Sequence, residues 1–177
     1  MNLFILRHAS AGTRRANPLL DTRRSLDKDG KRHCLQLSLI LNALNIQFDL
    51  IVSSPLKRCL QTASLIGTET GYEAQILHSN ALAPAATLKD FENLLSECSK
   101  VENLLLVGHN PNLTQFLGAL LVPNVAAPAS VRLRKGSIAR LVINRGPATL
   151  QALLDPRIVR ALYATSTRSS RRKTSRK

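Results

Sequence analysis

The sequence predicts an α/β domain with a mostly parallel central sheet flanked by helices. Short apolar runs, such as residues 3–6 and 104–107, alternate with longer segments whose apolar residues recur at helical spacing. A strand covered on both faces reads as such a run, and its alternation with helices is typical of parallel sheets. The length of 177 residues suits one domain. We expect this domain to span residues 1–164 and a basic tail to follow at 165–177.

The first predicted elements are the strand at 3–6, a polar loop over 9–26 and a helix that begins near Asp27 or Lys28. Four apolar residues of this helix follow the i, i+3, i+4, i+7 spacing of one face. They are Leu37, Ile40, Leu41 and Leu44. We expect this face to pack on the sheet.

The next strand, near residues 48–52, leads into a predicted helix start at Ser54 and Pro55. A serine side chain caps exposed backbone N–H groups, and proline suits the first helical position. We expect the helix to end near Gly71, because glycine is favoured just beyond a helix. Arg58 falls in the first turn, where a cation is unfavourable unless an anion is bound nearby.

The rest of the chain repeats the alternation. The remaining elements, in chain order, are a short strand near 75–77, a loop at 80–84, a helix capped by Thr87, a buried strand at 104–107, a helix over 113–120, a Pro/Ala loop at 122–130 and strands at 137–143 and 149–154.

The chain carries a net charge of +14, and six of its positive charges lie in the last ten residues, so residues 1–167 keep +8. A basic surface steers anionic substrates and partners. The tail has no apolar face and is expected to be disordered. Nucleic acid binding by this tail and a merely solvated terminus are both open. An aromatic content of 3% disfavours a stacking surface for RNA or single strands.

The composition also indicates where in the cell the protein is located. No apolar stretch approaches the length of a membrane span, and the opening run is too short for a signal peptide. We therefore expect no membrane contact and a cytoplasmic location. Cys34, Cys59 and Cys98 are widely spaced and are expected to be buried free thiols. No cofactor or metal is expected, because the histidines lack metal-ligand spacing and no phosphate-binding P-loop is present.

Arginine and histidine residues follow the carboxyl ends of three predicted strands. Arg7 and His8 end the first, Ser53 through Arg58 follow the second, and His109 follows the third. Ligands of open α/β sheets bind at that edge. Two guanidiniums and two imidazoles at one rim suit a tetrahedral phosphate, because phosphoryl transfer chiefly needs alignment and charge neutralisation.

The motifs at these positions resemble the histidine phosphatase superfamily (phosphoglycerate mutase-like), and within it the compact SixA-like phosphohistidine phosphatases. They are LRHASA at 6–11, DTRRSL at 21–26 with Gly30, SSPLKR at 53–58 with QTA at 61–63, and VGHNP at 107–111. A weaker echo is KGSIA at 135–139. The resemblance implies the compact fold without a helical insert.

The resemblance also implies roles. His8 is then the nucleophile that becomes transiently phosphorylated, and Arg7, Arg58 and His109 line the phosphate pocket. Arg24 is assigned to substrate phosphate, with a surface charge as its alternative. His33 and His78 match no motif and are expected to be ordinary histidines.

The chain departs from larger relatives, which supply a carboxylate that protonates the leaving alcohol. The corresponding region reads Leu82, Ala83, Pro84, without an acid. An alkoxide leaves poorly without a proton donor, so the absent acid favours a phosphoramidate such as phosphohistidine. Asp27 or Asp29 could still act as the acid. Ser10 replaces an acidic residue often seen in relatives.

These observations predict a metal-independent phosphatase that dephosphorylates phosphohistidine on a protein, such as a histidine phosphotransfer domain. Two alternatives remain open. One is a small-molecule phosphomonoesterase of the same superfamily, and the other is a phosphate-binding module without turnover.

Overall fold

Within the residues described by this computed structural model, 1–123 and 131–174, one six-stranded sheet has the order β3-β2-β4-β1-β5-β6. The strands are β1 (Asn2–Arg7), β2 (Leu50–Ser53), β3 (Leu77–His78), β4 (Asn103–Gly108), β5 (Ile138–Val142) and β6 (Thr149–Leu154). The first four pair in parallel, and β5 and β6 are antiparallel. The predicted α/β class with a mostly parallel sheet is confirmed.

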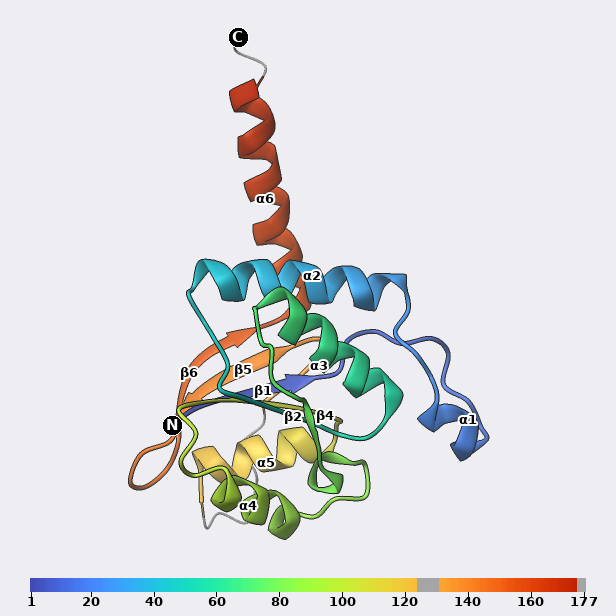
Figure 1. Cartoon of the computed structure of the whole chain (residues 1–177), viewed down its shortest axis with the longest axis vertical. Helices are drawn as coiled ribbons and strands as arrows, with labels where there is room; N and C mark the ends of the chain where they lie inside the picture. The colour runs from blue at the N-terminus through green and yellow to red at the C-terminus, as the bar shows by residue number, and fades with distance from the viewer. Residues whose placement is uncertain (124–130, 175–177) are drawn as a thin grey trace.

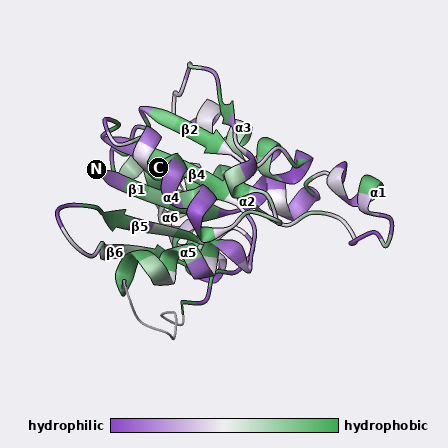
Figure 2. Cartoon of the chain, turned by 90° about the horizontal axis from the view of Figure 1, so that it is seen from below, coloured by the Kyte–Doolittle hydropathy of each residue, from purple (hydrophilic) through white to green (hydrophobic). Residues whose placement is uncertain are grey.

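Helices cover both faces of the sheet (Figure 1). They are α1 (Pro18–Thr22), α2 (Lys28–Ala43), α3 (Lys57–Glu69), the 3-10 helix η1 (Asn80–Leu82), α4 (Leu88–Glu97), α5 (Asn112–Leu121) and α6 (Pro156–Thr174). Phe4 and Leu6 of β1 pack in the cluster formed with α2 and α3, whereas Leu3 and Ile5 pack in the cluster formed with α4 and α5. Alternate residues of one strand therefore serve two cores, and Figure 2 shows the strands at the centre as mostly hydrophobic.

The predicted start of α2 near Asp27 and the predicted cap at Thr87 are both present. The Asp27 side chain accepts from the backbone N–H of Gly30 at the start of α2, and Thr87 forms a capping box with Asp90 on α4. Gly71, with φ 75°, follows the end of α3 as expected. The predicted cap at Ser54 is wrong, because α3 begins at Lys57 and has no side-chain cap.

Other boundaries differ from the sequence prediction. The polar loop over 9–26 contains the short helix α1. Leu44 lies beyond α2 and is 58% exposed, so it does not join the packed face. The loop expected at 122–130 lies mostly outside the described residues.

The tail expected to be disordered from residue 165 continues as α6 to Thr174. After Pro156 this segment contains neither proline nor glycine, and its alanine, leucine, arginine and lysine residues favour a helix. Figure 1 shows α6 projecting away from the sheet.

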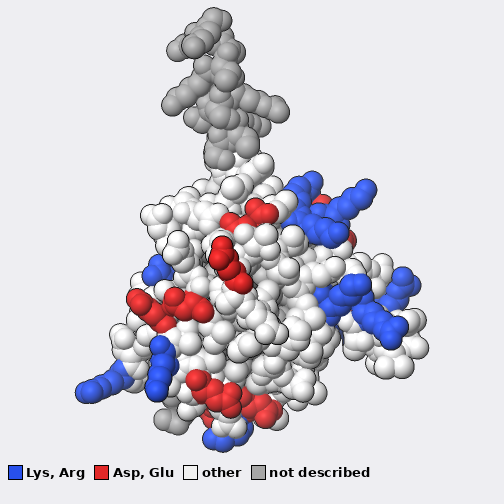
Figure 3. Space-filling model, in the orientation of Figure 1, with Lys and Arg blue, Asp and Glu red and all other residues white. Residues whose placement is uncertain are grey.

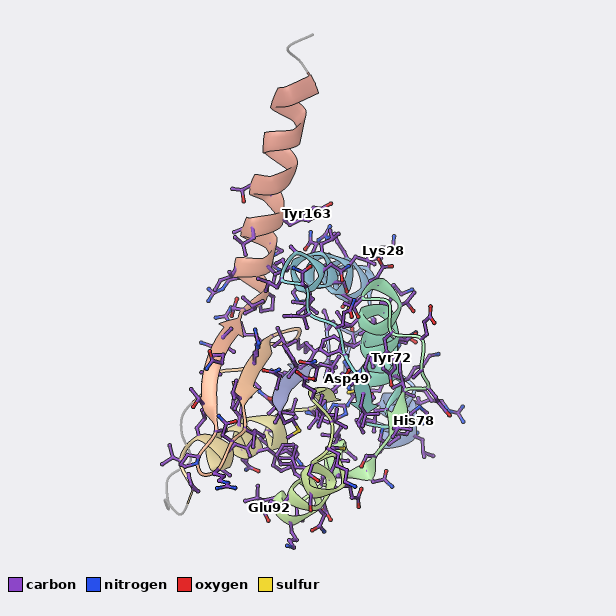
Figure 4. The ribbon with its side chains drawn as sticks, turned by 60° about the vertical axis from the view of Figure 1, so that its left-hand side comes forward. Lys28, Asp49, Tyr72, His78, Glu92 and Tyr163 are labelled. Atoms are coloured by element: carbon purple, nitrogen blue, oxygen red, sulfur yellow. The ribbon has the colours of Figure 1, made fainter. Side chains whose placement is uncertain are left out.

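The three cysteines and the two histidines outside the motifs lie in ordinary structural positions. Cys34, Cys59 and Cys98 are buried free thiols, as expected. His33 is buried, and His78 is exposed on the edge strand β3 (Figure 4). None of the helices in the described part of the chain is long and apolar enough to cross a membrane.

Candidate active site

The carboxyl ends of the three central parallel strands meet at one rim. Arg7 at the end of β1 pairs in register with Gly108, and Ser53 at the end of β2 pairs with Val107. Beside this rim lies a cavity of about 1010 Å³ whose wall contains all five predicted site residues. They are Arg7, His8, Arg24, Arg58 and His109. The structure therefore brings together residues that are up to 102 positions apart in the chain.

His8 is held by its backbone and its ring. Its N–H donates to the Gly108 carbonyl over 3.1 Å, and the neighbouring Ala9 N–H donates to Thr62 Oγ1 over 3.1 Å. The ring Nδ1 lies 2.8 Å from the Ala9 carbonyl oxygen, which only accepts, so Nδ1 carries the proton. In the neutral ring the lone pair is then on Nε2.

The same ring is kept neutral. Burial lowers the pKa of His8 to about 3, and the positive charges of Arg58, Arg7 and Lys135 act in the same direction, while the Ala9 hydrogen bond opposes them. At neutral pH the Nε2 lone pair is therefore available as a nucleophile without prior deprotonation.

His109 lies next to His8, with ring centroids 5.1 Å apart and planes tilted by 58°. Its Nε2 is 2.9 Å from Ser54 Oγ and 3.3 Å from Cys59 Sγ. Burial lowers the pKa of His109 to about 3, and His8 and Arg58 contribute. In the tautomer where the Ser54 hydroxyl donates to Nε2, the proton is on Nδ1, which lies 3.9 Å from Cys59 Sγ and can donate to a phosphate oxygen.

Arg58 is buried and Arg7 is half-buried, and the guanidinium of each donates to a backbone carbonyl. Arg7 Nη1 donates to the Leu133 carbonyl over 2.9 Å, and Arg58 Nη1 donates to the Asp21 carbonyl over 3.0 Å. The Nε of each is buried without a hydrogen-bond partner among the described residues. Burial lowers the pKa of both guanidiniums, which stay charged at neutral pH.

We call the loop that contains α1, residues 12–25, the arm. The Arg24 side chain makes its hydrogen bonds within or next to this arm. Its Nε donates to Asp21 Oδ1 over 2.9 Å, and its Nη1 donates to the Gly12 carbonyl over 2.9 Å. Asp21 Oδ2 also lies 3.4 Å from Arg58 Nη1. The structure thus shows Arg24 holding the arm, and its contact with substrate phosphate stays a prediction.

Asp21 was not assigned a role from the sequence, although an acid three residues before an arginine is a recognisable helical ion pair. Burial acts to raise the pKa of Asp21, but hydrogen bonds from Arg24 and Arg15 and the charges of Arg24 and Arg58 hold it below its usual value. Thr62 and Ser54 were also missed as supports of the histidines. Both lie in motifs whose side-chain directions a sequence does not reveal.

The candidate proton donors are ionised or distant. Asp27 lines the cavity, but its two oxygens accept from Ser10 Oγ and Gly30 N, each over 2.7 Å. Burial acts to raise the pKa of Asp27. The hydrogen bonds from Ser10 and Gly30 and the charge of Lys135 outweigh burial, so the pKa of Asp27 is below its usual value. Asp29 pairs with Arg32 in an exposed ion pair and is absent from the cavity wall.

Gly136 contacts the backbone of Arg7 and His8. Its N–H is 3.0 Å from the Arg7 carbonyl oxygen and 3.1 Å from that of His8. Its φ of +82° favours glycine, and a β-carbon there would meet the ring of His33. His33 Nε2 in turn lies 2.8 Å from the Gly136 carbonyl oxygen.

Comparison with known proteins identifies relatives in sequence and in fold. A family model of the histidine phosphatase superfamily (branch 1) matches residues 3–83. An uncharacterized protein of Picosynechococcus sp. is 31% identical over 158 residues, which cover 88% of this chain and 92% of the relative.

Solved structures share the fold. The protein histidine phosphatase SixA, complexed with tungstate, has a TM-score of 0.76 at 21% identity, covering 88% of this chain and 97% of that chain. A SixA protein of Agrobacterium tumefaciens gives 0.73 at 24% identity, with coverages of 88% and 97%. The alpha-ribazole phosphatase of Shigella flexneri gives 0.66 at 20% identity, with coverages of 88% and 97%. The chain belongs to the histidine phosphatase superfamily and has the SixA-like form of its fold.

Proposed function

We propose that this protein is a phosphatase that forms a covalent phosphohistidine on His8 and acts on phosphohistidine carried by another protein. The observation that supports this most directly is the state of the His8 ring. Nδ1 is bonded to the Ala9 carbonyl oxygen, the ring is neutral, and the cavity beside it contains Arg7, Arg58 and His109.

In the first step His8 Nε2 attacks phosphorus in line as the bond from phosphorus to the leaving nitrogen breaks. Arg7 and Arg58 neutralise the equatorial oxygens, and His109 donates to one of them. The leaving imidazole departs neutral when its other nitrogen carries a proton. In the second step a water oxygen forms the new bond to phosphorus, the bond to His8 breaks, and inorganic phosphate leaves.

The carboxylates favour this substrate class over an alkyl phosphate. Asp21 and Asp27 line the cavity, and both have a pKa below the usual value, so neither holds a proton at neutral pH. An alkoxide leaving group needs a proton donor, whereas a neutral imidazole does not. One protein that shares the fold is a protein histidine phosphatase, which points in the same direction.

A small phosphomonoester is the second candidate. Alpha-ribazole phosphatase and phosphoserine phosphatase share the fold at TM-scores of 0.66 each. A cavity of about 1010 Å³ also has room for more than a phosphate group.

The test compares three substrates: a histidine phosphotransfer domain phosphorylated on histidine, free phosphohistidine and a simple alkyl phosphate. We expect rapid turnover of the first two and little of the third. Quenching without acid should trap radiolabelled phosphate on the wild type and not on His8→Ala. His78→Ala is the matched control, because His78 is exposed on β3. Equal turnover of the alkyl phosphate would reject the phosphohistidine assignment, and an unlabelled wild type would reject the covalent mechanism.

A further inference from the structure

The arm stands away from the body beside the active-site cavity (Figure 1). Its base is closed by a bridge between Ala11 and Leu26 and by the Gly12 N–H, which donates to the Ser25 carbonyl over 3.2 Å. Arg24 and Asp21 join its inner side to Arg58. The arm is therefore held in a defined position relative to the nucleophile.

Two adjacent leucines on the arm face solvent. Leu19 is 75% exposed and Leu20 is 55% exposed, so two large apolar side chains lie next to each other in the chain on the surface. Figure 2 shows this hydrophobic stretch on α1, flanked by hydrophilic residues. The two leucines contribute to neither hydrophobic core.

The arm also carries cations without anionic partners. Arg14 and Arg15 line the active-site cavity, and Arg23 lines an adjoining cavity of about 540 Å³ that also includes Leu20. Their side chains form no ion pair with any residue in the described part of the chain. Figure 3 shows basic side chains gathered where α1 and the start of α2 lie.

We infer that the arm is the docking surface for the protein that carries the phosphohistidine, and that this partner has acidic side chains and an exposed apolar side chain next to its phosphorylated ring. The inference rests on the proposed function. A small polyanion would use the arginines but leave Leu19 and Leu20 exposed, whereas a protein surface can cover both. Interfaces commonly combine such an apolar centre with a charged rim.

The first test measures binding, so it does not depend on turnover. The probe is a histidine phosphotransfer domain phosphorylated on histidine, with acidic residues beside that histidine, titrated against His8→Ala. Adding Leu19→Ser with Leu20→Ser, or Arg23→Glu, should raise Kd about tenfold or more. The effect of Arg23→Glu should shrink in high salt. Leu39→Ser on α2, 54% exposed, and Lys89→Glu on α4 are matched controls and should leave Kd unchanged.

The second test separates docking from chemistry. In the catalytically intact chain, the same leucine and Arg23 substitutions should raise KM for the phosphorylated domain about tenfold with kcat retained. Turnover of free phosphohistidine should not change, which also shows that the variants are folded. Unchanged binding and KM in the arm variants would overturn the docking surface while leaving the proposed function intact. Absence of trapped phosphate on His8 would instead reject the proposed function, and the binding titration would still decide the docking surface.

Discussion

The hydroxyl of Ser54 lies 2.9 Å from Nε2 of His109, and both side chains are buried. This contact joins the segment after β2 to the segment after β4. It also explains why Ser54 does not cap α3, since its oxygen is 3.5 Å from the Leu56 N–H but close to the imidazole. The serine thus holds the direction of a ring that lies beside His8.

We expect Ser54→Ala to reduce kcat/KM about tenfold, because loss of one buried hydrogen bond corresponds to about 1–2 kcal/mol. The His109 ring resonances should shift in NMR spectra of the variant, which a purely structural role would not require. Ser53→Ala is the matched control, since Ser53 is equally buried and its hydroxyl donates to the Ser54 carbonyl. An unchanged rate with unchanged His109 resonances would contradict the orienting role.

Arg58→Ala should lower kcat at least about a hundredfold, because it leaves charge on the transition state uncompensated. Arg24→Ala should cost less, about tenfold, because Arg24 already donates to Asp21 and Gly12 in the arm. Arg58→Lys should not restore the rate, since an ammonium cannot reproduce the planar fork. Steady-state kinetics with free phosphohistidine measures all three. Equal losses from Arg58→Ala and Arg24→Ala would show that both contact the phosphate.

The histidine pair should make the protein acid-sensitive. Burial, aided by neighbouring cations, lowers the pKa of His8 and His109 from 6.5 to about 3, so the unfolded chain binds protons first as pH falls. Stability is therefore full above about pH 6.5 and declines towards pH 3, by several kcal/mol in total. Urea unfolding between pH 7.5 and 4.5 measures this slope. His8→Asn with His109→Asn should flatten it, leaving the smaller contribution of buried His33, whose pKa is also lowered by burial. The same slope in wild type and double variant would show that these rings are not the cause.

Gly136→Ala should destabilise the fold by about 1–3 kcal/mol, because its φ of +82° disfavours a side chain and the new methyl group meets His33. The same change should lower kcat, since the Gly136 N–H contacts the carbonyls of Arg7 and His8. Urea denaturation and kinetics give both values. Combining it with His33→Ala should relieve the steric part only, so the two substitutions should be non-additive. If the losses in the free energy of unfolding from Gly136→Ala and His33→Ala were additive, the strain would lie in the backbone at residue 136 and not in the contact with His33.

Local patterns in the sequence were sufficient for most elements. The apolar runs that became β1 and β4 could be recognised because a strand buried on both faces needs nearly every side chain to be apolar. Thr87 and Gly71 were recognised at helix ends because capping depends on neighbouring backbone groups. Ser54 is different, because its hydroxyl contacts His109, 55 positions away, and does not cap α3. A local pattern cannot reveal a partner so distant in the chain.

Residue patterns along the chain predict the fold class, the alternation of its elements and the four residues that suit phosphate chemistry, Arg7, His8, Arg58 and His109. How those residues are held depends on contacts between segments that are far apart in the chain. The Asp21 contact with Arg58 spans 37 positions, and Gly136 contacts Arg7 and His8 from the turn before the neighbouring strand β5. Periodicity and capping act within a few residues and can be read along the chain, whereas side-chain direction and burial arise only when distant segments pack together.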